Sequence, residues 1–155
     1  MEKEINGVRE LKEKKLVGYR VVCKDGTEYA KEIPKAAIVL EQRKSEIKQL
    51  VEPVKLIGAF KAKETSEEYD GYWVCFEVHK FEDIPEEMVG LQIPSQKVAV
   101  LDFNGHRSKI FNVYTHLHEW INENGYKRLP EKWTLEIYSE WSESENKVDL
   151  CDPIE

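Results

Sequence analysis

Cysteine is scarce in this 155-residue sequence, which has only Cys23, Cys75 and Cys151 and no CxxC pair. Widely spaced cysteines of this kind usually stay reduced and are buried as small apolar side chains, which indicates a reducing compartment. The amino terminus lacks the apolar segment of a secretory signal, and no apolar run approaches the ~18 residues that a membrane-spanning helix needs. We therefore expect a cytoplasmic protein that has no membrane as a partner.

Several motifs of catalysis and cofactor binding are also missing. The chain has no GxSxG elbow, no GxxxxGK[ST] phosphate loop, no GxGxxG turn and no HExxH zinc motif. His116 and His118 lie two positions apart, so on a helix they do not share a face and do not hold one metal ion together. The acidic stretches at 82–83 and 86–87 lack the spacing of a calcium loop. We expect neither a cofactor nor a metal.

Basic residues are fewer than acidic ones, 23 Lys and Arg against 30 Asp and Glu, which gives a net charge of −7. A nucleic acid is a poor partner for such a chain, because binding phosphates needs a concentrated basic face. The negative field favours cations and neutral aromatic compounds instead. With 41% apolar and 34% charged residues, the chain has the composition of a folded protein, and its length fits one domain.

Alternating and helical apolar patterns predict the same order of elements twice: a strand, a helix and two further strands. We place the half-repeats at about 15–84 and 85–155, after a charged and frayed lead-in at 1–14. Helices gathered on one side of a largely antiparallel sheet make an α+β fold, which leaves the other side for an aromatic groove. The predicted strands are 15–24, 55–61, 72–79, 88–103 (bent at Pro94), 133–141 and 148–154, and the predicted helices are 33–51 (with Pro34 as a first helical residue) and 108–122.

The strand at 132–141 contains the strongest candidate for a functional residue. Its alternation places three apolar residues on a face that should pack under the helices, and Glu136 between Thr134 and Tyr138 on the other face. One interpretation is a half-exposed strand whose outer face meets water. The other is a carboxylate on the floor of a pocket, where it pairs with a ligand cation or, with a raised pKa, acts as an acid or base.

Further side chains are candidates for the walls of the same pocket. Trp73, Cys75 and Glu77 lie on the face of the strand at 72–79 that is opposite its apolar face. Aromatic walls around a buried carboxylate favour flat, cationic or electrophilic guests, through stacking and cation–π attraction. The other candidates for ligand-binding residues are Tyr19, Phe103 and Trp141.

A set of short motifs, in this order and spacing, resembles the GyrI-like small-molecule-binding family, which also forms the effector-binding part of AraC-type and MerR-type regulators. The likeness covers about residues 15–154. The motifs are YWVCFEV at 72–78, LQIPSQKVAVL at 91–101, NG at 104–105, the helix with Trp120, NGY at 124–126, LEIY at 135–138 and VDLCDPI at 148–154.

The resemblance implies two related strand-helix-strand-strand modules around one groove lined by aromatic residues. The family's pocket glutamate corresponds to Glu136, and its neighbouring aromatic residue to Tyr138. The sequence departs from the family at three positions: Cys75 stands where glycine is frequent, and Cys151 and Asp152 stand where larger apolar residues are usual.

Three functions are compatible with this resemblance, and residues 1–14 are too few for a helix-turn-helix that would make the chain a DNA-binding regulator. The first is a detoxifying hydrolase of electrophilic, cyclopropane-bearing aromatic compounds, with Glu136 as general base and Tyr138 donating to the developing oxyanion. The second is a non-catalytic module that sequesters or senses cationic aromatic drugs. The third is a gyrase-inhibitor-like interaction with a protein partner through the acidic exterior.

Overall fold

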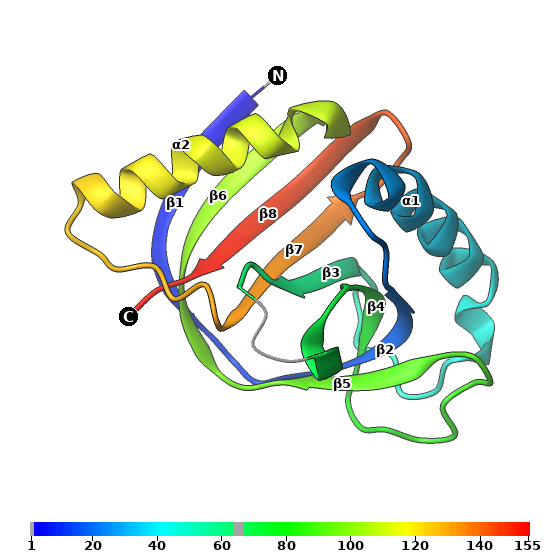
Figure 1. The fold of residues 1–155 in the computed structure, drawn as a ribbon. Helices are drawn as coiled ribbons and strands as arrows, with labels where there is room; N and C mark the ends of the chain where they lie inside the picture. The colour runs from blue at the N-terminus through cyan, green and yellow to red at the C-terminus, as the bar shows by residue number, and fades with distance from the viewer. Residues whose placement is uncertain (1, 64–66) are drawn as a thin grey trace.

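One antiparallel eight-stranded sheet carries two helices on the same side (Figure 1), in the computed structural model, which describes residues 2–63 and 67–155. This confirms the α+β fold. In each half the helix is followed by two strands, as predicted, but two strands and not one precede it. The order of strands in the sheet is β1-β6-β8-β7-β3-β4-β2-β5. The strands are β1 Glu2–Leu11, β2 Lys14–Val21, β3 Leu56–Lys61, β4 Tyr72–Val78, β5 Val89–Ile93, β6 Gln96–His106, β7 Trp133–Glu140 and β8 Glu145–Pro153, and the helices are α1 Gly26–Gln42 and α2 Ile110–Glu123.

The amino-terminal segment differs from the frayed lead-in that its charge predicted. Residues 2–11 form strand β1, which pairs with β6 up to Leu11, opposite Gln96. Ile5 and Val8 pack against the hydrophobic cluster under α2. The charged residues on either side of this apolar pair are exposed, as in a half-buried edge strand, so a high charge content did not exclude a strand here.

Helix α1 begins seven residues earlier than its apolar spacing predicted. Asp25 is the N-cap, and its side chain accepts a hydrogen bond of 3.0 Å from the backbone N–H of Glu28. Pro34 is therefore a buried residue inside the helix and not its first residue. The Asp25-Gly26 pair, which resembles a turn, is the start of the helix, because a capping aspartate satisfies an amide that has no partner in the first turn.

The sheet curls until its two ends meet along a single ladder. Strand β1 continues into β2 and β5 continues into β6, and the pair Leu11–Gln96 is followed in register by Lys14–Ile93. Figure 1 shows these two long, bent segments running side by side below the rest of the sheet. Strands β1 and β5 pair with one neighbour each, β6 and β2, and each of the other strands pairs with two. Because the two ladders continue one another in register, the concave face of the sheet closes around its own side chains.

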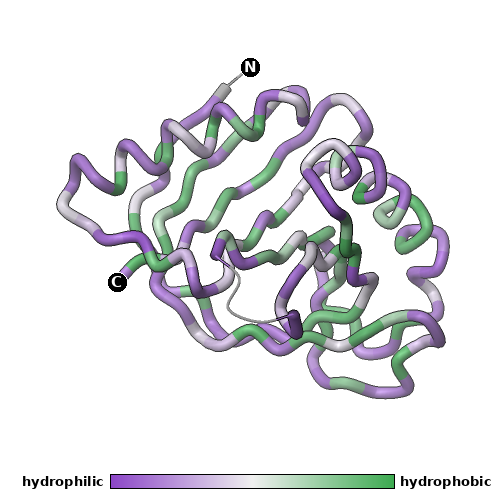
Figure 2. Tube along the Cα trace, viewed as in Figure 1, coloured by the Kyte–Doolittle hydropathy of each residue, from purple (hydrophilic) through white to green (hydrophobic). Residues whose placement is uncertain are grey.

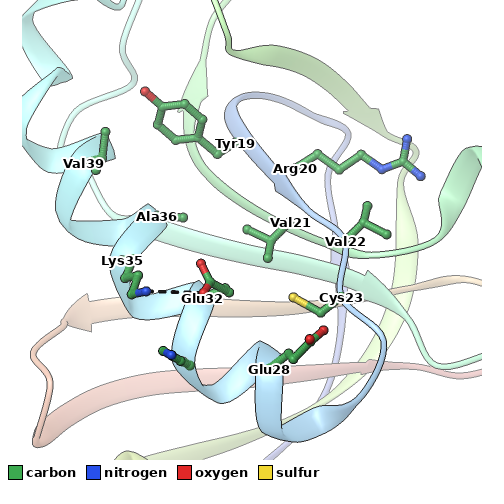
Figure 3. Close-up of a pocket in the computed structure, with 11 residues that line it drawn as sticks. Tyr19, Arg20, Val21, Val22, Cys23, Glu28, Glu32, Lys35, Ala36 and Val39 are labelled. Carbon is green, nitrogen blue, oxygen red and sulfur yellow. Dashed lines mark hydrogen bonds and ion pairs between the residues drawn. The ribbon is translucent and has the colours of Figure 1, made fainter.

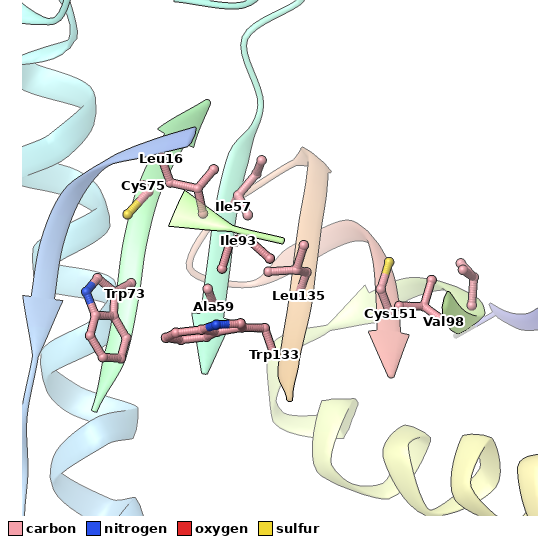
Figure 4. Close-up of a cluster of buried hydrophobic side chains, with 11 residues drawn as sticks. Leu16, Ile57, Ala59, Trp73, Cys75, Ile93, Val98, Trp133, Leu135 and Cys151 are labelled. Carbon is pink, nitrogen blue, oxygen red and sulfur yellow. The ribbon is translucent and has the colours of Figure 1, made fainter. Parts of the chain in front are cut away.

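The closed face holds a hydrophobic cluster that no helix covers (Figure 4). Trp73 and Trp133 meet edge to face there, with ring centroids 5.2 Å apart. The opposite face of the sheet packs against α2 through Val113, Leu117 and Ile121, and against α1 through Ala37 and Leu40. Hydrophobic and hydrophilic residues alternate along both helices (Figure 2). The prediction of a free sheet face for ligand binding therefore differs from the structure.

A pair of aspartates lies on adjacent strands, Asp102 on β6 directly opposite Asp149 on β8. Partial burial and then the neighbouring Asp102 raise the pKa of Asp149 from 3.8 to about 6. A carboxyl whose pKa is higher in the folded protein contributes stability below pH ~4, and this stability is lost as the pH rises to about 6.

We expect Asp149→Asn to raise the melting temperature at pH 7 and to leave it unchanged at pH 4. After allowance for solvent screening, the gain is about 1 kcal/mol. Thermal unfolding at the two pH values measures it. Glu145→Gln, which removes the same charge at the exposed end of β8, is the control and should show no such pH-dependent gain. Equal gains in both variants would contradict the role of the pair.

Candidate functional site

Glu136 lies in the middle of β7, on the face that the two helices cover, and is only 6% exposed. Gly58 of β3 stands directly opposite Glu136 in the ladder. A Cβ atom at position 58 would overlap the hydroxyl of Tyr72. The glycine therefore makes the space into which the phenol of Tyr72 reaches, beside the carboxylate.

Three phenols donate hydrogen bonds to this one carboxylate. Tyr72 of β4 and Tyr138 of β7 donate to Oε1, the latter over 3.5 Å, and Tyr114 of α2 donates to Oε2 over 2.8 Å. Phe60 completes the group: its ring stacks on Tyr72 with centroids 5.8 Å apart and meets Tyr114 edge to face at 6.3 Å. We call Phe60, Tyr72, Tyr114 and Tyr138 the aromatic cage of Glu136.

Burial and hydrogen bonding act on Glu136 in opposite directions. Burial raises the pKa of its carboxyl, the three phenol hydrogen bonds lower it, and burial is the larger effect. Burial and the adjacent Glu136 also raise the pKa of each of the three tyrosines, so the phenols stay protonated as donors. A positive charge entering the cage would favour the ionised carboxylate and relieve the cost of its burial.

Among the residues predicted from the sequence, Trp141 is the one that the structure brings next to the cage. It is half-buried and packs against the clusters under both helices. Together with Tyr138, Leu56 and Phe76 it lines a groove of about 580 Å³ between α1 and the sheet. Tyr138 therefore belongs to both the groove and the cage, so the groove adjoins the cage at this side chain, although Glu136 itself does not line the groove.

Trp73, Cys75 and Glu77 are placed differently from the prediction, on the face of β4 that points away from Glu136. Trp73 and Cys75 are buried in the closed face of the sheet (Figure 4), and Glu77 forms an ion pair with Lys14 at 3.3 Å. Alternation correctly separated the two faces of β4, but the face with the aromatic cage is the one that contains Tyr72. The sheet curls around the other face, so Trp73 and Cys75 do not line the cage.

Tyr19 and Phe103 lie on the helix-covered face but do not contact Glu136. Phe103 is buried in the cluster under α2. The hydroxyl of Tyr19 accepts a 2.6 Å hydrogen bond from Arg43. Tyr19 lines a separate groove of about 640 Å³ between the end of β2 and α1, where Glu32 and Lys35 form an ion pair (Figure 3).

The sequence reasoning missed Phe60, Tyr72 and Tyr114. Tyr72 lies on the face of the strand 72–79 that alternation predicts to be apolar, and Tyr114 lies within the predicted helix 108–122. One signal was available, since a tyrosine on a buried face needs an acceptor for its hydroxyl, and Glu136 was the unpartnered carboxylate. What the sequence did not contain is the register that sets β3 and β4 beside β7.

A curled antiparallel sheet, two helices on one face and a buried carboxylate in an aromatic cage together define an α+β domain with one candidate site for a small molecule. The chain belongs to the family of GyrI-like small molecule binding domains, whose model matches residues 7–155. No curated protein matches it in sequence. Among the described residues, no helix has both the length and the apolar character that crossing a membrane would require.

Solved structures share this fold at low sequence identity. The EcmrR C-terminal domain is 22% identical with a TM-score of 0.73, over 100% of this chain and 99% of that one. In the EcmrR–DNA complex, the chain matches only 57% of the regulator's length. SAV2435 bound to tetraphenylphosphonium is 13% identical with a TM-score of 0.72, covering 100% and 94%. A hydrolase from Listeria innocua is 11% identical with a TM-score of 0.51, covering 99% and 92%.

Proposed function

We propose that this protein binds bulky aromatic cations, with Glu136 as the counter-ion and the aromatic cage as the surface that the cation contacts. The observation that carries the proposal is a carboxylate that is nearly fully buried and held by three phenols between the two helices. An organic cation compensates a buried negative charge and gains cation–π attraction from the surrounding rings.

The geometry of Glu136 favours binding over catalysis. Three phenol hydroxyls already donate to its two oxygens, which leaves less of the carboxylate available to take a proton from water. The net charge of −7 supports attraction of a cation to the protein. SAV2435, which has the same fold, is bound to tetraphenylphosphonium, an aromatic cation. This makes tetraphenylphosphonium a suitable probe for the present chain.

Calorimetric titration of the purified protein with tetraphenylphosphonium tests the proposal. We expect binding in the micromolar range and at least about 30-fold weaker binding of tetraphenylborate, which has the same four phenyl groups around a negative centre. The difference isolates the contribution of charge from that of apolar burial. Equal affinities for the two compounds would contradict the counter-ion role of Glu136, and no binding of the cation would contradict the proposed function.

Hydrolysis of an electrophilic aromatic compound is the second candidate. Burial raises the pKa of Glu136, as suits a general base, and Tyr138 lies 3.5 Å from Oε1 as a proton donor. In this reaction Glu136 takes a proton from water, the hydroxide attacks a cyclopropane carbon, and the electrons of the broken C–C bond move to an oxygen that is protonated. The product is heavier by one water, so mass spectrometry after incubation with a cyclopropane-bearing alkylating indole decides between turnover and binding alone.

A further inference from the structure

A chain of contacts leads from the aromatic cage to a second buried carboxylate. His118 follows Tyr114 by one turn of α2, and the two rings lie with centroids 5.8 Å apart at 36°. On its other side, Nε2 of His118 is 3.5 Å from Oδ2 of Asp152, to which Nε of Arg128 donates a 2.8 Å hydrogen bond. Tyr114 therefore stands between Glu136 and a histidine that has its own charged partners.

Asp152 is a rigid anchor for this chain of contacts. It is 2% exposed on β8 and paired with Ala99 of β6, at a position where the family resemblance led us to expect an apolar residue. Arg128, which neutralises it, is held by a bridge to Ile154, and the next residue, Leu129, donates a 2.9 Å backbone hydrogen bond to Pro153. A buried carboxylate with one fixed cationic partner has little freedom to move, so it orients the half-buried imidazole.

Charged and titratable groups lie near His118 on three sides. Asp152 faces it from β8, Arg128 from the segment before β7, and Tyr114 from its own helix, with Glu136 of β7 behind that ring. Burial lowers the pKa of His118, Asp152 opposes this and Arg128 adds to it. The imidazole is therefore neutral at pH 7 and above, and it gains its charge only on acidification.

We propose that His118 is a positioning residue for Tyr114: as neutral imidazole it packs the phenol ring so that its hydroxyl reaches Glu136, and as imidazolium it adds a positive charge beside the cage that opposes the binding of an organic cation. By linkage, a bound cation in turn favours the neutral imidazole. The effect on affinity rests on the proposed function, whereas the effect on the Tyr114 ring does not.

The ring of Tyr114 reports the proposed contact without any ligand. In protein with 13C-labelled tyrosine, with the signal assigned by Tyr114→Phe, we expect the Tyr114 resonance to follow two pH transitions, one from Glu136 and one from His118. His118→Gln should remove the second transition. His116→Gln, on the same helix, is the matched control and should keep both. A Tyr114 profile in His118→Gln that superimposes on that of the wild type would overturn the proposal.

A second variant keeps the proposal testable if His118→Gln does not fold. Arg128 lowers the pKa of His118, so removing its charge by Arg128→Gln should move the His118 transition of the Tyr114 signal to higher pH. A transition that stays at the pH of the wild type would count against the contact chain.

Affinity for tetraphenylphosphonium gives the functional readout, because this probe keeps its charge at every pH. Between pH 8 and pH 5.5, affinity should fall about two- to five-fold more in the wild type than in His118→Gln. This is the effect expected of one added positive charge on the imidazole, whose repulsion of the bound cation is partly screened by solvent. Identical losses would overturn the effect of His118 on binding. If the wild type does not bind the probe at pH 8, the proposed function fails, and the Tyr114 signal still decides the positioning role.

Discussion

Glu136→Gln lowers the affinity for tetraphenylphosphonium by about 30- to 100-fold, or about 2–3 kcal/mol, if the carboxylate is the counter-ion. Glutamine has nearly the same shape. Its Oε1 can still accept from Tyr72 and Tyr138, and its NH2 group faces the hydroxyl of Tyr114, which can rotate to accept from it, so the main change is loss of the negative charge. Calorimetric titration of the wild type and the variant at pH 8, well above the usual pKa of a carboxyl group, measures the loss.

The control for this prediction is Glu140→Gln, which removes the same charge from the exposed end of the same strand. It should leave the affinity within about two-fold, because an exposed charge at a distance is screened by salt. Glu136→Gln should be at least as stable as the wild type at pH 8, since burial raises the pKa of Glu136 and its ionised form costs folding free energy there. A variant that folds and keeps wild-type affinity would contradict the counter-ion role.

Gly58→Ala has the second largest expected effect. The added methyl group displaces a side chain of the cage and leaves the charge of Glu136 unchanged. The new Cβ would overlap the hydroxyl of Tyr72 and force the phenol away from Glu136. Overpacking of this kind costs about 1–2 kcal/mol of stability. We expect affinity for the probe to fall by about ten-fold, since one of the three donors that hold the carboxylate leaves it. Chemical denaturation and calorimetric titration measure the two effects.

Gly26→Ala is the matched control for Gly58→Ala, because a Cβ atom at position 26 meets nothing within 4 Å. It lies at the start of α1, so alanine should leave both stability and affinity at least at the wild-type level. The double variant Gly58→Ala with Tyr72→Phe should recover part of the stability, because the overlapping hydroxyl is gone, but none of the affinity. Recovery of affinity in the double variant would show that the hydroxyl of Tyr72 is not needed at the site.

Local patterns were enough to find the strand that carries the site. Alternation within 132–141 separated Glu136 and Tyr138 from the apolar residues of β7, and the structure keeps these two residues on one face. The same argument separated Tyr72 from Trp73 on β4 correctly. The choice between the two faces was wrong, because alternation says which residues share a face and does not say what covers it.

For the helices too, local spacing predicted the elements but not their tertiary contacts. The apolar stripe of α2 was recognised from spacing alone, and the helix lies at 110–123 where 108–122 was predicted. Spacing did not reveal that His118, on the flank of this stripe, would meet Asp152 some thirty residues later in the chain. For α1, Pro34 predicts a start seven residues too late, because the helix is capped by Asp25 and Pro34 lies inside it.

The sequence by itself determined the class of fold, the order of the elements and the carboxylate to which the site belongs, because these depend on residue types at short, regular spacings. Only the tertiary structure decided that the sheet curls onto itself, and with it which face closes around a core and which face carries the aromatic cage. The cage around Glu136 joins β3, β4, β7 and α2, and the register between strands far apart in the chain comes from packing and loop geometry, which no local pattern contains.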